Sequence, residues 1–528
     1  MRNFQLPGRS VAYGIHGMAA TSSPLATVAA LDVLKNGGNS VDAAVTASAV
    51  LCITEPHMTG IGGDCFALIG KNDGTIEGIN GSGRASARAD AGWLKASGLN
   101  AIDPKSVHAV TVPGAIDAWA ALLARHGTMD LKEALRPAIR HAEEGVPTTP
   151  RVAADWAQDA DELSADEGAR LHYLKDGKPP QVGAVMRYKA LAQTLRLIAE
   201  KGRDGFYEGA IAEEIVTHLA ARGSLLTMDD FAVTRSSWVE PIATAFAGVE
   251  LLEIPPNGSG LTALIALNIL KQFDMARYGE ASPERYHLQI EALKLAWVLR
   301  NRHIADQDAM TIAPATLLSD KIAGELAGRI DMKRALVSPE NLIAMPGSDT
   351  VYLTVADKDG MAVSFINSIY WSFGSGIVTP RSGIALQNRG TDFVTEPGHP
   401  NCIGPGKRPL HTIIPAMVRR RGRIDMSFGV MGGAYQPMGH LGVMLNRYVY
   451  GMDVQAALDF PRAFPQQGLV EVEAGIDAAL RRGLAARGHD LVDASEPLGG
   501  GQAILFDRAL NVLAGGSDFR KDGLALGY

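Results

Sequence analysis

A predicted β-hairpin that begins at Thr350 constrains the fold more than any other part of the sequence. The run 350–356 is rich in β-branched residues and partly alternates in polarity, which is typical of a strand. Asp-Lys-Asp-Gly at 357–360 is a tight-turn sequence, and the run 361–368 again has strand character. The two runs therefore predict antiparallel neighbours, with Thr350 at the start of one strand and Ser368 on the return strand.

The rest of the chain combines a helical middle with strands on either side of it. Residues 120–340 are predicted to be mostly helical, and strands are expected to concentrate around 65–80 and 350–390. Residues 25–35 carry apolar side chains at helical spacing, and Ser40 is a plausible cap of a second helix. The clearest amphipathic segments are 187–201, 207–222 and 284–300. The pattern predicts a mixed α+β protein but does not fix the order of its layers.

Composition and charge exclude several classes of protein. Of the 528 residues, 46% are hydrophobic and 20% are charged, which indicates a compact globular chain. The net charge of -7 and the absence of a long Lys/Arg run argue against a nucleic-acid partner. The longest run of small apolar residues, 43–54, is too short to span a bilayer, so no membrane partner is expected.

Cysteine and histidine spacing gives no support for a disulfide framework or a metal site. Cys52, Cys65 and Cys402 form no Cys-x-x-Cys pair, and so sparse a set fits a reducing compartment. The sequence has no His-x-x-x-His motif, so neither a metal nor another cofactor is predicted. Residues 1–10 lack the apolar core of a signal peptide, which makes the cytoplasm the expected location.

Several glycine-bearing motifs accompany the hairpin: Gly-Gly-Asn-Ser-Val-Asp-Ala-Ala at 37–44, Glu-Pro-His-Met-Thr-Gly-Ile-Gly-Gly at 55–63, Phe-Gly-Ser-Gly at 373–376, Gln-Asn-Arg-Gly-Thr-Asp-Phe at 387–393 and Gly-Val-Met-Gly-Gly-Ala at 429–434. With the segment at Thr350, they make the sequence resemble the γ-glutamyltranspeptidase family over nearly its full length. The resemblance implies an N-terminal nucleophile hydrolase with a four-layer αββα sandwich. It also implies a precursor that cuts itself between Asp349 and Thr350. Its large subunit would be 1–349 and its small subunit 350–528, held together as a heterodimer in one folded unit that could dimerise further.

A threonine at a new chain start is chemically useful. A hydroxyl is a poor nucleophile until a base takes its proton, and an N-terminal α-amine, with a reference pKa of about 7.7–8.0, can be that base. Before cleavage the nitrogen of Thr350 is an amide and has no such function. The intact chain is therefore expected to be an inactive precursor.

Two other features of the resemblance concern the reaction centre. Gly432 and Gly433 correspond to the glycine pair whose backbone N–H groups stabilise the tetrahedral oxyanion, although a simple tight turn is the alternative. Ser368 stands where the family has a threonine hydroxyl that bonds the nucleophile and assists self-cleavage. A serine keeps that hydroxyl.

The residues that bind substrate depart from the family pattern. The position of the carboxylate-binding arginine is Asn80, and the serine pair is replaced by His411 and Thr412. The asparagine and glutamine on the amine side are replaced by Tyr370 and Arg389, and only Asp392 is retained. Losing the arginine removes a bidentate carboxylate contact, whereas Arg389 with His411 could hold a small carboxylate beside the scissile amide. Arg389 could instead be structural and simply pair with Asp392.

Three functional hypotheses follow from this pattern. The first is a self-processing amidohydrolase for a small carboxylate-bearing amide, similar to the cytoplasmic family members that hydrolyse oxamate in purine degradation. The second is a γ-glutamyl hydrolase or transferase that acts on glutathione or related compounds. The third is a non-catalytic relative that binds a metabolite. Retention of Thr350, a hydroxyl at 368, Asp392 and the glycine pair favours an enzyme.

Overall fold

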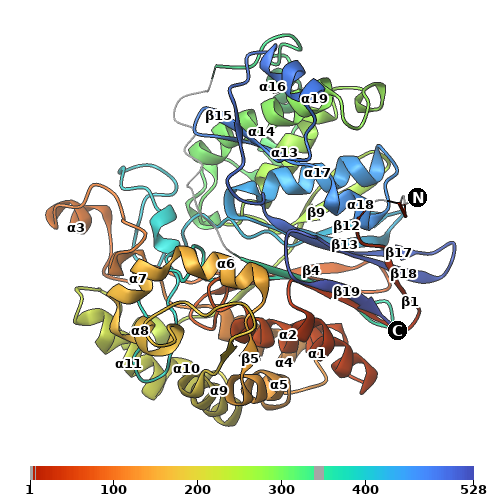
Figure 1. Cartoon of the computed structure of the whole chain (residues 1–528). Coiled ribbons are helices and arrows are strands. Elements are labelled where there is room, and N and C mark those ends of the chain that lie inside the picture. Colours follow the sequence, from red (N-terminus) through yellow and green to blue (C-terminus); the bar gives the residue numbers. More distant parts are fainter. Residues whose placement is uncertain (1–3, 6, 338–349) are drawn as a thin grey trace.

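The strands form two antiparallel seven-stranded sheets that stack face to face in a computed structural model, which describes residues 4–5, 7–337 and 350–528 (Figure 1). In order across the first sheet lie β1 (Ala12–Gly14), β18 (Val512–Ser517), β17 (Gly500–Asp507), β13 (Arg423–Met431), β12 (Ala416–Arg420), β9 (Val249–Glu253) and β8 (Ile242–Phe246). The second sheet runs β19 (Leu524–Gly527), β2 (Met18–Thr21), β10 (Val351–Ala356), β11 (Ala362–Ser368), β3 (Asp64–Gly70), β4 (Ile76–Gly81) and β7 (Ser237–Val239).

Helices cover the outer face of each sheet, so the architecture is the predicted αββα sandwich (Figure 1). Over the second sheet lie α1 (Pro24–Lys35), α2 (Ser40–Thr54), α4 (Ala115–His126), α5 (Leu131–Glu144) and α9 (Lys189–Lys201). Over the first sheet lie α13 (Gly260–Leu270), α14 (Pro283–His303), α17 (Gln436–Tyr448) and α18 (Val454–Asp459). No helix within the described residues has the length and apolar content needed to cross a membrane.

Smaller elements complete the layers. The shorter helices are α3 (Ala91–Ala96), α6 (Pro150–Gln158), α7 (Ala160–Ala165), α8 (Glu167–Tyr173), α10 (Asp204–Tyr207), α11 (Ala210–Ala220), α12 (Met228–Ala232), α15 (Pro314–Leu317), α16 (Asp320–Ala327) and α19 (Ala478–Ala485). Two minor sheets comprise β14 (Ala463–Gln466), β15 (Leu469–Val472) and β16 (Leu491–Asp493), and β5 (Val146–Pro147) with β6 (Val185–Met186). The amphipathic segments predicted at 187–201 and 207–222 are confirmed as helices α9 and α11. The segment 284–300 is confirmed as a helix, α14, but it is buried on all sides along 285–297 rather than on one face.

Alternation along β10 divides its side chains between two cores. Val351, Leu353 and Val355 pack toward α2 and its neighbours, whereas Tyr352 belongs to the core between the sheets. This period of two is the geometry of a strand that is buried on both faces. It explains why the run 350–356 lacks the strongly polar alternate positions of an exposed strand.

The hairpin predicted at Thr350 is confirmed, and it lies in the middle of the second sheet. Val351 pairs with Asn367 and Ala356 with Ala362 in an antiparallel register. The expectation of strands as far as residue 390 is wrong, because β11 ends at Ser368 and the next strand starts at Ala416. The intervening chain is an irregular loop, and its only β-type contact within residues 369–392 is an isolated bridge.

Helix α2 anchors the turn of this hairpin. Its cap is Asn39 rather than the predicted Ser40: Asn39 Oδ1 accepts hydrogen bonds from the N–H groups of Val41 and Asp42, and the Asp42 side chain completes a capping box. Ser40 therefore does not cap the helix and makes other contacts. Its N–H donates to Asp357, and its hydroxyl lies 2.9 Å from the carbonyl oxygen of Met361 and 3.0 Å from Asp357, which ties the helix to the turn between β10 and β11.

A glycine allows the two sheets to approach closely next to Thr350. A Cβ on Gly429 would lie 2.3 Å from the ring of Tyr352, so only glycine fits beneath that tyrosine. Two residues along each strand, the hydroxyls of Thr354 and Ser427 lie 2.7 Å apart. Continuing the same two-residue spacing toward the strand ends places Met431 opposite Thr350. We therefore place Gly432 and Gly433, which follow Met431, at the edge of the space between the sheets, near the start of the hairpin.

Candidate active site

Thr350 and Ser368 meet at the open end of the hairpin. Both side chains are fully buried, and Thr350 Oγ1 lies 3.0 Å from Ser368 Oγ. Ser368 Oγ also accepts a hydrogen bond from the Tyr370 N–H at 2.8 Å. The structure thus brings together the two hydroxyls that the sequence analysis singled out. Asp349, the other half of the predicted cleavage bond, lies outside the described residues.

The chain turns sharply after Ser368 and brings a tyrosine against Arg389. Tyr370 has a φ of 82°, in the left-handed region that few non-glycine residues adopt. The turn is held by Asn388, whose side chain accepts a hydrogen bond from the Trp371 N–H and whose backbone N–H donates to the Ile369 carbonyl. Arg389 follows directly, and its guanidinium carbon lies 3.7 Å from the centre of the Tyr370 ring.

Arg389 is fully buried and only partly hydrogen-bonded. Nη1 donates to Thr412 Oγ1 at 2.9 Å and lies 3.4 Å from Asp392 Oδ2, while the hydroxyl of Tyr370 donates to Asp392 Oδ1 at 2.7 Å. Nε and Nη2 have no partner among the described residues. Burial lowers the pKa of Arg389, against the charge of Asp392, and burial raises the pKa of Asp392, against the charge of Arg389. One weak contact to Asp392 leaves most of the guanidinium donors unused.

His411 does not offer the charged donor that the sequence analysis expected. Burial and the neighbouring charge of Arg389 lower its pKa to about 3, so the ring is neutral near pH 7. Nε2 lies 3.0 Å from Asp64 Oδ2, and Nδ1 accepts the Ile413 N–H at 3.4 Å. With both nitrogens occupied, His411 has no ring N–H left for a ligand. Its neighbour Thr412 still touches Arg389.

Asn80 is also held within the protein rather than directed at a ligand. Its amide nitrogen donates to Asn257 Oδ1 at 2.8 Å, and its Oδ1 accepts the Ser82 N–H at 3.0 Å. Asn257 Nδ2 in turn donates to Ser82 Oγ and to the Pro409 carbonyl. This polar network joins the end of β4 to the segment that precedes His411.

The glycine pair ends β13 in a conformation suited to exposed N–H groups. Gly432 has a φ of 120° and Gly433 a φ of 47°, both in the region that favours glycine. A Cβ on Gly432 would lie 2.8 Å from the Cα of Gly499. Within the described part of the chain, neither N–H donates to a protein group. Two adjacent unoccupied donors at a strand end can stabilise a developing oxyanion.

Two residues that support this site were not singled out from the sequence. Asp64 accepts hydrogen bonds from the Gly83 N–H, Gln387 Nε2 and His411, and Gln387 also donates to Thr111. Asp64 directly follows the glycine-rich motif 55–63, and Gln387 opens the motif that contains Arg389. Their place beside those motifs was the only signal in the sequence. Their contact could not be predicted, because it joins residues that are 323 positions apart.

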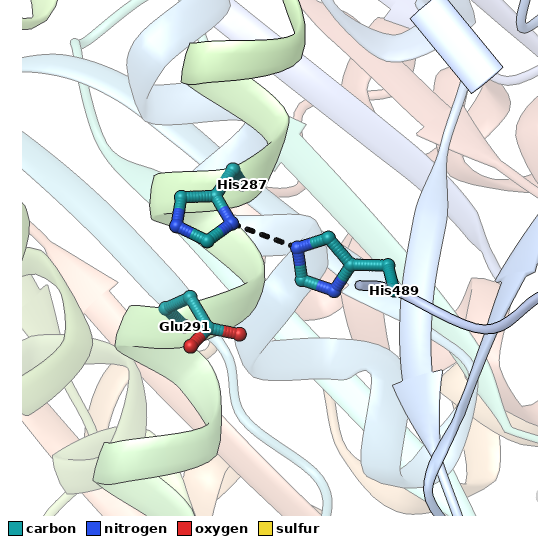
Figure 2. Close-up of side chains that lie close together, drawn as sticks. All are labelled: His287, Glu291 and His489. Atoms are coloured by element: carbon teal, nitrogen blue, oxygen red, sulfur yellow. Dashed lines mark hydrogen bonds between the residues drawn. The ribbon is translucent and has the colours of Figure 1, made fainter. Parts of the chain in front are cut away.

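A second cluster of titratable side chains lies away from the reaction centre, and its donor atoms could ligate a metal (Figure 2). His287 and Glu291 lie one turn apart on α14, and His287 Nδ1 lies 2.8 Å from His489 Nε2. The other ring nitrogen of His287 bonds the Asp331 carbonyl at 2.9 Å. Glu291 already accepts hydrogen bonds from Lys294 and from a backbone N–H, so a cation would have to displace Lys294. The contacts present tie α14 to the segment around Asp331.

Comparisons with known proteins agree with the resemblance drawn from the motifs. The family profile described as Gamma-glutamyltranspeptidase matches residues 26–528. A glutathione hydrolase-like YwrD proenzyme of Bacillus subtilis is 36% identical over 97% of this chain and 99% of its own length. An oxamate amidohydrolase proenzyme of Klebsiella pneumoniae is 35% identical, over 97% and 98%. The crystal structure of a cephalosporin acylase from Bacillus halodurans superimposes with a TM-score of 0.93 at 42% identity, covering 100% of this chain and 99% of that one.

Proposed function

The chain belongs to the gamma-glutamyltranspeptidase family of N-terminal nucleophile hydrolases, and from that premise we propose that it is a self-processing amidohydrolase for a small amide that carries a carboxylate. Oxamate is the best single candidate. Thr350 is the nucleophile in both self-cleavage and turnover. The observation that carries the choice of substrate is the pair of unpartnered, buried N–H groups on Arg389.

Self-cleavage starts when Thr350 Oγ1 attacks the carbonyl carbon of residue 349. The peptide C–N bond breaks, an ester forms at Oγ1, and the nitrogen of Thr350 becomes a free α-amine after it takes up a proton. Water then hydrolyses the ester. The Ser368 hydroxyl, 3.0 Å from Oγ1, supports this step by accepting or relaying the hydroxyl proton.

Turnover repeats the same chemistry on a substrate. The α-amine takes the proton of Thr350 Oγ1 as the oxygen attacks the amide carbon, and the N–H groups of Gly432 and Gly433 stabilise the oxyanion. The C–N bond breaks and the amine leaves with that proton, as ammonia when the substrate is oxamate. Water hydrolyses the acyl ester, which releases the acid and restores the hydroxyl.

Arg389 supports a carboxylate next to the scissile carbonyl. It is linked to Thr350 through a short path: Oγ1 to Ser368, Ser368 to the Tyr370 N–H, and the Tyr370 ring to the guanidinium. A guanidinium with two adjacent free donors matches the geometry of a carboxylate. Thr412, Asp392 and Tyr370 fix its orientation, whereas His411 and Asn80 act in this proposal as positioning residues behind it.

The two fragments, 1–349 and 350–528, are proposed to stay together after cleavage. Each sheet contains strands from both sides of Thr350, so separating the fragments would break both cores. We also keep the cytoplasm as the proposed location. Cys52, Cys65 and Cys402 are free thiols, which supports a reducing compartment.

A γ-glutamyl hydrolase or transferase remains the second candidate, because one relative is named as glutathione hydrolase-like. A panel of oxamate and glutathione, with ammonia and glutamate as readouts, separates the two functions. The proposal predicts ammonia from oxamate and little glutamate from glutathione. Efficient release of glutamate with oxamate untouched would reject it in favour of the second candidate. A processed protein that hydrolyses neither would favour a binding role.

A further inference from the structure

Strands β12 and β13 separate from each other just before β13 ends, close to the glycine pair. Their pairing stops at Ala416, which lies opposite Phe428. A regular antiparallel ladder would continue two residues further and place Ile414 opposite Val430. Ile414 lies outside β12, however, so the backbone groups of these two residues need other partners.

A serine of the other sheet marks the point where the two strands part. Ser364 on β11 is fully buried, and its Oγ accepts the Ala416 N–H at 3.0 Å. The same hydroxyl donates to the Phe428 carbonyl at 3.2 Å. The serine thus bridges the two strands where a direct backbone hydrogen bond would otherwise join them.

Two side chains of helix α17 bind the N–H groups that the interrupted ladder leaves free. Gln436 and His440 lie about one turn apart on this helix, which covers the outer face of the sheet (Figure 1). The Ile414 N–H donates to Gln436 Oε1 at 3.0 Å, and the Val430 N–H donates to His440 Nε2 at 3.3 Å. Both side chains are fully buried. A Cβ on Gly439 would lie 2.6 Å from Val430 Cγ1, so a glycine there allows the helix to approach this closely.

Glu253 fixes the form of His440 that accepts this hydrogen bond. Because Nε2 accepts the Val430 N–H, the ring proton is on Nδ1, which lies 2.6 Å from Glu253 Oε1. Glu253 is also fully buried, on the neighbouring strand β9. Glu253 Oε2 and Gln436 Nε2 have no hydrogen-bond partner among the described residues. Buried polar atoms without partners cost stability, so the fold alone does not account for these side chains.

The two segments held in this way lead directly into the proposed active site. Thr412, two residues before Ile414, accepts a hydrogen bond from Arg389 at 2.9 Å. Gly432, two residues after Val430, begins the pair of oxyanion donors. Helix α17 therefore makes one polar contact to the segment that supports the carboxylate site and one to the segment that supports the oxyanion site.

We propose that Gln436 and His440 are positioning residues that fix the separation between the oxyanion donors and Arg389. The inference rests on the proposed function and deepens it, because both side chains act through the backbone rather than on the substrate. His440 holds the strand that carries the glycine pair, whose N–H groups stabilise charge only in the transition state, so its loss lowers kcat. Gln436 holds the segment of Thr412, which orients Arg389 for substrate binding, so its loss raises KM.

Paired substitutions separate these two effects in steady-state kinetics with oxamate, or with glutathione if that amide is the one hydrolysed. We expect His440→Leu to lower kcat at least about tenfold and to change KM by less than about twofold. His440→Gln, whose side-chain carbonyl can accept the Val430 N–H, should keep kcat within about threefold of the wild type. Gln436→Leu should raise KM at least about fivefold with kcat within about twofold. Met444→Leu, a buried change on the same helix, is the matched control and should alter neither constant.

Rescue by the glutamine distinguishes positioning from a loss of folding. Thermal unfolding shows whether each variant folds. If His440→Leu does not, His440→Asn takes its place, because its amide ends where Nδ1 of the histidine lies and does not reach the Val430 N–H. Unchanged kcat in the folded variant, or an equal loss in His440→Gln, would overturn the role of His440. Unchanged KM in Gln436→Leu would overturn that of Gln436.

A reactive ester separates this inference from the function on which it rests. If the processed wild type hydrolyses neither oxamate nor glutathione, the proposed function fails. Acetylation of Thr350 by p-nitrophenyl acetate, followed by mass spectrometry of the small fragment, then decides, because this ester needs the oxyanion donors but carries no carboxylate. At least about tenfold slower acetylation in His440→Leu, with His440→Gln and Gln436→Leu reacting as fast as the wild type, supports the positioning roles. Equal rates in all variants, or no acetylation of the wild type, overturn them.

Discussion

Arg389 is the residue whose side chain most limits what the site can bind. A buried guanidinium is stable when its five N–H donors find acceptors, yet here the contacts to Thr412 and Asp392 use only Nη1. The alternative in which Arg389 only pairs with Asp392 accounts for a single contact at 3.4 Å. A bound carboxylate would accept hydrogen bonds from both Nε and Nη2, the two unpartnered nitrogens.

Replacing Arg389 should weaken the binding of the carboxylate substrate. Arg389→Met keeps the apolar stem beside Tyr370 but removes every donor. Charge-assisted hydrogen bonds contribute about 1.5–3 kcal/mol each, so we expect kcat/KM to fall by about ten- to 150-fold, mainly through KM. Steady-state kinetics of ammonia release measures the effect, with Arg419→Met on β12 as the control. Unchanged kinetics in Arg389→Met would mean that another residue binds the substrate carboxylate.

At the scale of single elements, the strand β13 and its terminal glycines set the other half of the site. The strand passes over β10, with Gly429 beneath Tyr352, and then ends at the φ-positive pair. Any side chain at Gly432 would meet the backbone of Gly499. The position of the two N–H donors thus depends on Gly429, which lets β13 approach β10, and on the glycines that end β13.

Gly433→Val should lower turnover by at least about a hundredfold, the usual order for a lost oxyanion donor. Valine is strongly disfavoured at a φ of 47°, so the N–H groups would be displaced. Gly442→Ala, in α17 where nothing lies within 4 Å of an added Cβ, is the matched control. Rates of self-processing and of amide hydrolysis should be compared in both variants. Near-normal rates in Gly433→Val would mean that the pair is only a turn.

Local patterns in the sequence were sufficient to predict most of the helices and strands, but not the contacts between residues that are distant in the sequence. The hairpin, the helix α1 and the amphipathic helices α9 and α11 were predictable because each is encoded by periodicity within about twenty residues. The helix α14 was also predictable, but not that it is buried on all sides along 285–297. The loop after Ser368 was not, since its apolar residues pack in the core without pairing as strands. His411 was misjudged because its neutral state depends on burial and on the charge of Arg389, and because its Nε2 is occupied by Asp64, which is 347 residues away.

At the scale of the whole molecule, buried groups from distant segments tie the layers together. His287 on α14 contacts His489 across 202 residues of sequence, and Arg462 and Arg520 both pair with Asp518. The contact between His287 and His489 joins parts of the chain from both sides of Thr350, whereas the pairs with Asp518 lie within 350–528. Their protonation states therefore affect the stability of the complete two-fragment protein.

His489 should make the folded protein less stable in mild acid. Burial and the charge of Lys294 lower its pKa to about 3, below the ordinary value of about 6.5. Folding favours the neutral ring, so this contribution is fully present above about pH 6.5 and is lost as the pH falls toward about 3. Between about pH 7 and pH 5, His489→Gln should lose about 2 kcal/mol less unfolding free energy than the wild type. Urea unfolding at both pH values tests this, with exposed His16→Gln as the control. An equal loss in all three proteins would contradict it.

Self-cleavage before Thr350 is the central claim, and N-terminal sequencing of the purified protein tests it most directly. The account predicts two fragments without added protease, with the smaller one beginning Thr-Val-Tyr-Leu. Thr350→Ala should remain a single 55.9 kDa chain with no amide hydrolysis, while its folding stays close to unaffected because the threonine side chain is a small loss from a strand. A wild-type chain that hydrolyses amides while it stays intact, or a small fragment that begins at any residue other than Thr350, would contradict the account.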